Sequence, residues 1–164
     1  VIQGTEYAHR KIHARGLRDE FSLALGTVRT IWGVLRDDPR FNQSVSISLR
    51  LDDAVESATH ETLILVVSTL HRLFFGMRPF WGTGPGRLRM TLIEQHCTRF
   101  LRTFISIARG HPNRNAVPQS GYISHNANAI HLSMDGGLNL DGEIIQVQGE
   151  VSIDTTASLR FLRL

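Results

Sequence analysis

The sequence predicts a mainly β fold, an antiparallel β-sandwich or distorted barrel with about two helices, and therefore α+β by content. Residues 44–51 alternate strictly between apolar and polar side chains, as a strand with one buried face does. Short strand-like runs follow one another after residue 120, with glycine-containing turns between them. Only two stretches have the three- and four-residue apolar spacing of helices.

The two helices are expected at residues 17–36 and 95–108. Asp37-Asp38-Pro39 ends the first, and Gly110 is a natural stop for the second. Cys97 falls on the apolar stripe of the second helix, so we expect a small buried hydrophobic residue there. It is the single cysteine of the chain, which excludes an internal disulfide.

The first two strands are expected at 44–51 and 62–70, where they can pair as a hairpin. The second is almost continuously apolar, which suits a strand covered on both faces. Further strands are expected at residues 87–93, 121–124, 128–134, 138–140, 144–153 and 158–163.

The length of 164 residues fits a single domain, 1–164, with ordinary hydrophobic and charged content. No apolar stretch is long enough to span a bilayer, and the single cysteine favours a reducing cytoplasm. The chain begins at Val1 rather than at Met, as expected of a processed product or a fragment.

Charge is distributed unevenly along the chain. Of the 18 basic residues all but Lys11 are arginine. Residues 72–114 hold eight arginines and one acid, Glu94, whereas residues 135–154 hold five acids and no basic residue. The basic segment favours contact with phosphate or an anionic surface. Scattered, solvated arginines are the alternative.

Residues 74–86 form an unusually aromatic loop. Four glycines and two prolines prevent a regular element, yet the segment contains Phe74, Phe75, Phe80 and Trp81. These aromatics either plug one end of the fold or line an apolar pocket, with Arg72 and Arg78 facing a phosphate-bearing membrane surface.

Asp141-Gly142-Glu143 lies between two apolar runs and predicts a hairpin turn, because Gly142 can adopt a positive φ at little cost. In isolation the two carboxylates are most simply a turn former and a solvated charge at a strand end. The alternative is that Asp141 is a catalytic base.

Other chemistry has little support. His9 and His13 share a helical spacing, but no third zinc ligand completes the set. The chain has no G-x-S-x-G elbow, no P-loop and no G-x-G-x-x-G, so we expect no nucleotide site within it.

Residues 71–82, which include Arg-Pro-Phe-Trp-Gly at 78–82, together with 84–89 and 138–143, resemble the C-terminal half of bacterial diacylglycerol kinase catalytic-domain proteins. Residues 1–7 look like a strand entering that half. The family is similar to the wider lipid kinase group that includes sphingosine kinases.

This resemblance implies a two-domain enzyme, in which an N-terminal domain binds ATP through a Gly-Gly-Asp-Gly-Thr loop and the C-terminal domain holds the lipid. That loop is absent from this chain, which is therefore expected to be inactive alone. ATP and Mg²⁺ would be bound mainly by the missing domain. Asp141 would act as general base on the lipid hydroxyl, and Glu143 would help to arrange the site.

The resemblance also implies substrate-binding roles for Phe74, Phe75, Arg78, Phe80 and Trp81, with no metal ligand among them. The expected partners are a diacylglycerol-like lipid, a membrane surface, the chain's own nucleotide-binding domain and a second copy in a homodimer, with no nucleic acid. The expected location is the cytoplasm, peripheral to the inner membrane.

One departure from the family pattern affects the metal. Family members often follow the glycine-rich loop with a stretch whose Asp helps to bind a structural magnesium, and residues 84–91 lack that Asp. Two alternatives to a lipid kinase remain: a non-catalytic lipid- or membrane-binding β-sandwich, and a kinase with a non-lipid acceptor.

Overall fold

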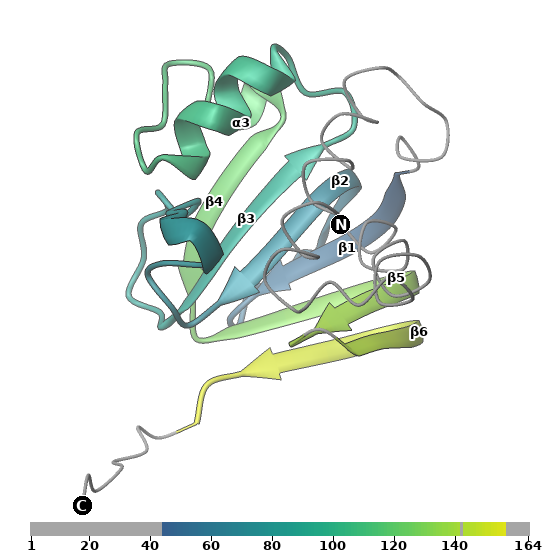
Figure 1. Ribbon diagram of the computed structural model, residues 1–164. Helices are drawn as coiled ribbons and strands as arrows, with labels where there is room; N and C mark the ends of the chain where they lie inside the picture. Colours follow the sequence, from purple (N-terminus) through teal and green to yellow (C-terminus); the bar gives the residue numbers. More distant parts are fainter. Residues whose placement is uncertain (1–43, 142, 157–164) are drawn as a thin grey trace, which may run out of the picture.

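The computed structural model describes residues 44–141 and 143–156, which form six strands, one α-helix and two short 3₁₀ turns (Figure 1). The strands are β1 (Val45–Leu51), β2 (Ala58–Ser68), β3 (Leu88–Glu94), β4 (Tyr122–Ala127), β5 (Ala129–Leu140) and β6 (Glu143–Asp154). The helix is α3 (Phe100–Ala108), and the 3₁₀ turns are η3 (Phe74–Gly76) and η4 (Pro118–Ser120).

All six strands belong to one antiparallel sheet with the order β4-β3-β2-β1-β5-β6. The sheet does not close, and β4 and β6 are its edges. The prediction of a mainly β, antiparallel fold is confirmed, with an open or sandwich-like arrangement.

The main core lies on one face of this sheet. The alternation in β1 places Ile47 and Leu49 on that face, and the register aligns Leu49 with Leu132 of β5. From β3, Met90 and Leu92 join the same cluster. Each large apolar side chain buried in this way stabilises the fold by about 1.5–3 kcal/mol.

A second, smaller cluster lies where α3 packs against β3 and β4. Ile107 of the helix meets Ile93 and Tyr122, and the rings of Phe100 and Phe104 stack with centroids 5.4 Å apart. The Tyr122 hydroxyl donates a hydrogen bond to the main-chain oxygen of Thr98 at 2.7 Å. Apolar packing therefore holds the helix to the sheet, and a partly buried hydrogen bond holds the segment that leads into the helix.

The helix predicted at 95–108 begins only at Phe100. Two of residues 95–99 give their main-chain N–H groups to other segments instead: Gln95 donates to the main-chain oxygen of Glu61, and Thr98 donates to that of Ser120. Arg99 is left-handed, with φ 53°. Cys97 consequently precedes the helix, although burial still raises the pKa of its thiol. The predicted stop is confirmed, since α3 ends at Ala108.

Two predicted strands, 128–134 and 138–140, form the single strand β5. Gly136 and Gly137 were expected to interrupt it, but they pair in register with Val147 and Gln146 of β6. A long partner strand thus keeps the glycine pair extended.

β2 is half-buried along residues 63–68, whereas the sequence predicted a strand covered on both faces. The predicted helix 17–36, the predicted strand 158–163 and the pair His9 and His13 lie outside the described residues.

Asp52 stabilises the connection between β4 and β5 by accepting hydrogen bonds from it. Only Asn128 separates these strands, although they lie in different parts of the sheet (Figure 1). The Asp52 carboxylate accepts N–H bonds from Asn128 at 2.6 Å and from Ala129 at 3.0 Å. These bonds, that from Ala129 most strongly, hold the pKa of Asp52 below its usual value.

We expect Asp52→Asn to lower the free energy of unfolding by about 1–2 kcal/mol at neutral pH, because hydrogen bonds to a charged acceptor become bonds to a neutral one. The pKa of Asp52 is lower in the folded protein than in the unfolded chain. The extra stability of wild type over Asp52→Asn is therefore complete above the ordinary carboxyl pKa of about 4, and it is lost as the pH falls through the pKa of Asp52 in the folded protein. Urea unfolding across that range measures this difference. Asp53→Asn, in the same turn but exposed, is the control. Equal midpoints for wild type and Asp52→Asn at neutral pH would refute the assignment.

Candidate functional site

The Asp141-Gly142-Glu143 segment forms the turn between β5 and β6, as the sequence predicted. Leu140 pairs with Glu143, so Asp141 and Gly142 make the connection. Asp141 has φ 49°, a conformation that Asp tolerates better than most residues. The side chains of Asp141 and Glu143 are both exposed. The turn therefore presents two carboxylates to their surroundings.

An apolar stripe leads along the hairpin to these carboxylates. Leu138 pairs with Ile145, and Leu140 pairs with Glu143, with no register shift from the core residue Met134 onward. The alternation of strands therefore places these side chains on the same face of the sheet as the main core. Leu140 is 58% exposed and Ile145 is 44% exposed. The core-facing stripe thus continues into an uncovered apolar surface beside Glu143.

The aromatic loop packs against α3 and β4. The side chain of Trp81 packs against the second cluster, and the main-chain N–H group of Trp81 donates a hydrogen bond to Ser124 Oγ at 3.2 Å. Phe80 is half-buried, whereas Phe75 and Arg78 are exposed. Phe74 opens η3, and its side chain lies outside the described residues. Among the five residues proposed from sequence to bind substrate, Phe75 and Arg78 are therefore the ones seen to be exposed.

The structure does not bring the aromatic loop and the Asp141–Glu143 turn together. The loop lies along edge strand β4, where Thr83 bridges to His125. The turn belongs to the β5–β6 hairpin at the other edge of the sheet. It also lies at the end of the 12-residue strand β5 that is farther along the chain from the β4–β5 corner. In Figure 1 the loop lies at the left, beside β4, and the β5–β6 hairpin lies at the lower edge of the sheet. They are two separate surfaces.

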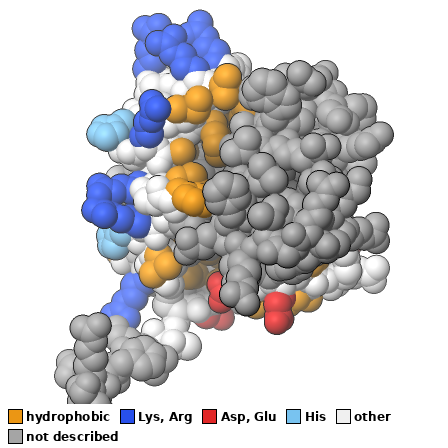
Figure 2. All heavy atoms as spheres, viewed as in Figure 1, with side chains coloured by type: hydrophobic (Ala, Val, Ile, Leu, Met, Phe, Trp, Pro, Cys, Tyr) orange, Lys and Arg blue, Asp and Glu red, His pale blue; other side chains and the backbone are white. Residues whose placement is uncertain are grey.

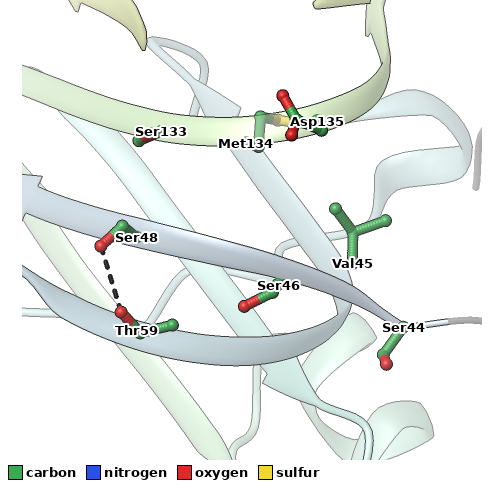
Figure 3. A pocket seen from close by; sticks show the side chains of 8 residues that line it. All are labelled: Ser44, Val45, Ser46, Ser48, Thr59, Ser133, Met134 and Asp135. Carbon is green, nitrogen blue, oxygen red and sulfur yellow. Dashed lines mark hydrogen bonds between the residues drawn. The ribbon is translucent and has the colours of Figure 1, made fainter. Parts of the chain in front are cut away.

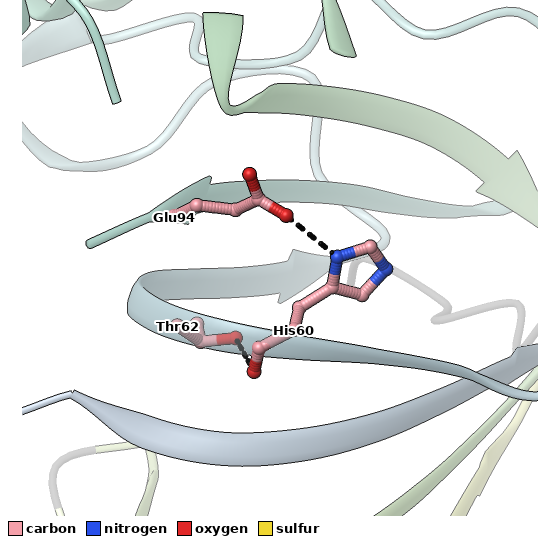
Figure 4. Close-up of polar contacts among 3 residues, drawn as sticks. All are labelled: His60, Thr62 and Glu94. Carbon is pink, nitrogen blue, oxygen red and sulfur yellow. Dashed lines mark hydrogen bonds and ion pairs between the residues drawn. The ribbon is translucent and has the colours of Figure 1, made fainter. Parts of the chain in front are cut away.

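A carboxylate–imidazole pair, which the sequence analysis missed, lies on the core-facing side of β2 and β3 (Figure 4). His60 Nδ1 is 2.8 Å from Glu94 Oε1, and both side chains are partly buried. Thr62 Oγ1 donates to the main-chain oxygen of His60. The described residues place no third His, Cys, Asp or Glu close enough to this pair to complete a metal site.

A shallow groove of about 400 Å³ lies on the opposite, polar face of β1 and β5 (Figure 3). Its lining is rich in hydroxyl groups, and Ser48 Oγ is 3.1 Å from Thr59 Oγ1. Asp135 is the one carboxylate among the lining residues. Hydroxyl groups suit polar ligands, so this groove does not fit an acyl chain.

Within the described part of the chain, no helix is long and apolar enough to cross a membrane. No protein-family model, curated protein or solved structure matches the chain.

Proposed function

We propose that this chain is the substrate-binding half of an ATP-dependent lipid kinase that phosphorylates the hydroxyl group of a diacylglycerol-like lipid. The observation that carries the proposal is the pair of exposed carboxylates, Asp141 and Glu143, at the end of an exposed apolar stripe. A lipid with a free hydroxyl requires this combination: an apolar surface for its chains, and a carboxylate near its head. The resemblance of residues 71–89 and 138–143 to diacylglycerol kinases supports it.

In the proposed reaction, Asp141 accepts the proton of the lipid hydroxyl as its oxygen bonds to the γ-phosphorus of ATP and the bond to ADP breaks. Glu143, across the turn, orients the acceptor. ATP and Mg²⁺ would supply the phosphoryl group and neutralise phosphate charge. The proposal assigns both to a separate nucleotide-binding domain, as the resemblance implies.

The apolar stripe gives a test of the lipid acceptor. We expect Leu140→Ser combined with Ile145→Ser, in the full-length protein, to raise the KM for diacylglycerol about tenfold, because two partly buried contacts contribute about 1.4 kcal/mol together. The KM for ATP should not change. Initial rates with labelled ATP and diacylglycerol in mixed micelles measure both constants.

Val55→Ser is the matched control, because Val55 is an exposed apolar residue in the β1–β2 connection. A double variant with the wild-type KM for diacylglycerol would show that the stripe does not bind the acceptor. A rise in the KM for ATP alone would assign the stripe to the nucleotide-binding domain.

A second candidate is a non-catalytic lipid- or membrane-binding module. The exposed arginines between residues 72 and 114 favour it, because they suit phosphate groups on a lipid surface. This function predicts vesicle binding and no phosphoryl transfer, even when the nucleotide-binding domain is present.

A further inference from the structure

A basic face surrounds α3 and the aromatic loop. Its exposed arginines are Arg72, Arg78, Arg99, Arg102, Arg109 and Arg114. Within residues 44–141 and 143–156, none of these six forms an ion pair with a carboxylate. The one acid in this part of the sequence, Glu94, is bonded to His60. Figure 2 shows the blue side chains gathered beside α3 and the loop, with the red ones at the lower part of the view.

The outward side of α3 is apolar as well as basic. Leu101 is 41% exposed and Ile105 is 40% exposed, whereas Thr103 and Ile107 are buried against the sheet. Leu101, Ile105 and Arg109 follow one another at four-residue steps, which places them in one row along the helix. Arg102 lies beside that row. The helix therefore presents an apolar ridge flanked by cations.

The loop adds an aromatic side chain to this surface. Phe75 is 64% exposed and has a left-handed backbone, with φ 54° and ψ 21°, which bulky residues rarely adopt. The Leu73 N–H group donates to the Met77 main-chain oxygen at 2.9 Å and closes the loop around Phe75. A large apolar residue is therefore exposed in a backbone conformation that is uncommon for its type.

Arg78 joins the loop to the helix. The main-chain N–H group of Arg78 donates a hydrogen bond to the main-chain oxygen of Ala108, the last residue of α3, at 2.9 Å. A Cβ at Gly110 would lie 3.1 Å from the Arg78 Cβ, so the Arg78 side chain packs against the turn that follows the helix. The loop that carries Phe75 is thus held to the C-terminal end of α3.

We propose that this basic face docks the chain on an anionic phospholipid bilayer, with Phe75, Leu101 and Ile105 at the acyl boundary and Arg78, Arg102 and Arg109 on the lipid phosphates. Arginine and apolar or aromatic side chains gather together at membrane interfaces. The phosphates of a nucleic acid would also pair with the arginines, but a nucleic acid would offer no apolar surface to Leu101 and Ile105. A second copy of the same face would place unpaired arginines against arginines.

Vesicle sedimentation without ATP tests the docking surface independently of the kinase proposal. We expect the 164-residue chain to bind phosphatidylcholine vesicles that contain phosphatidylglycerol, and not vesicles of phosphatidylcholine alone. Binding should weaken strongly between about 0.1 M and 0.5 M salt, because screening shortens the reach of the arginines. Arg78→Gln, Arg102→Gln and Arg109→Gln together should weaken it at least about tenfold.

The apolar part of the surface is tested by Phe75→Ser and by Leu101→Ser with Ile105→Ser. Each should weaken vesicle binding about fivefold or more, with unchanged thermal unfolding. Arg50→Gln on β1 and Val55→Ser in the β1–β2 connection are matched controls and should bind as wild type does.

Several results would overturn the proposal: no vesicle binding, equal binding to both kinds of vesicle, or equal losses in the controls. Binding to an oligonucleotide that survives Phe75→Ser and the Leu101 and Ile105 substitutions would assign the face to nucleic acid instead. A concentration-dependent dimer that the arginine substitutions abolish would assign it to a second copy.

Discussion

Asp141→Asn in the full-length protein is expected to lower kcat for diacylglycerol phosphorylation about 10²–10⁴-fold, with little change in either KM. Asn has nearly the shape of Asp but does not accept the proton of the lipid hydroxyl. Asn also tolerates the left-handed conformation of residue 141, and Asn-Gly is a favoured pair in two-residue hairpin turns. The fold should therefore survive, and the loss should be confined to the chemical step.

Initial-rate measurements with labelled ATP give kcat and both KM values for this variant. Glu150→Gln is the matched control, because Glu150 is another exposed carboxylate on β6, away from the turn. Thermal unfolding of Asp141→Asn should agree with wild type. A variant that keeps its activity within about twofold would refute the base assignment, since a positioned base contributes at least about 10²-fold.

Gly86→Ala is expected to lower the free energy of unfolding by about 2–4 kcal/mol. A Cβ at Gly86 would overlap the main-chain carbonyl group of Ala127, the last residue of β4. Neither backbone can move easily, because Leu88 pairs with Ala127 two residues farther along the chain. The aromatic loop must then separate from β4, and Trp81 must shift within the second cluster.

Gly76→Ala in the same loop separates this overlap from backbone strain. Gly76 has φ 71°, and an added Cβ would meet no atom within 4 Å. Its cost should be only that of a left-handed alanine, about 1 kcal/mol. Chemical denaturation of the two variants measures the difference. If Gly86→Ala were as stable as Gly76→Ala, the close approach of the loop to β4 would be wrong.

The strands and the hairpin were predictable because their signals are local. The alternation of Val45, Ile47, Leu49 and Leu51 depends only on which residues share a face, and the structure keeps that face on the core. Asp141-Gly142 specifies its turn through two adjacent residues. The start of α3 was not predictable, because Gln95 and Thr98 give their N–H groups to Glu61 and Ser120, which are distant in sequence.

The candidate site was only partly predictable for the same reason. The carboxylates of Asp141 and Glu143 and the aromatic loop are each visible as short segments. Their separation follows from the strand order, which places the loop on β4 and the turn on the β5–β6 hairpin. The contact between His60 and Glu94 spans 34 residues and depends on a register shift between Thr62 and Ile64 of β2. No local pattern reports that shift.

The central claim is that the acceptor is a lipid hydroxyl. Mass spectrometry of the products tests it most directly, after the full-length protein is given ATP, Mg²⁺ and an equimolar mixture of diacylglycerol and a soluble polyol. The proposal predicts a phosphomonoester of diacylglycerol, with the polyol unchanged. A phosphorylated polyol, or an unchanged diacylglycerol in a protein that binds ATP, would contradict it.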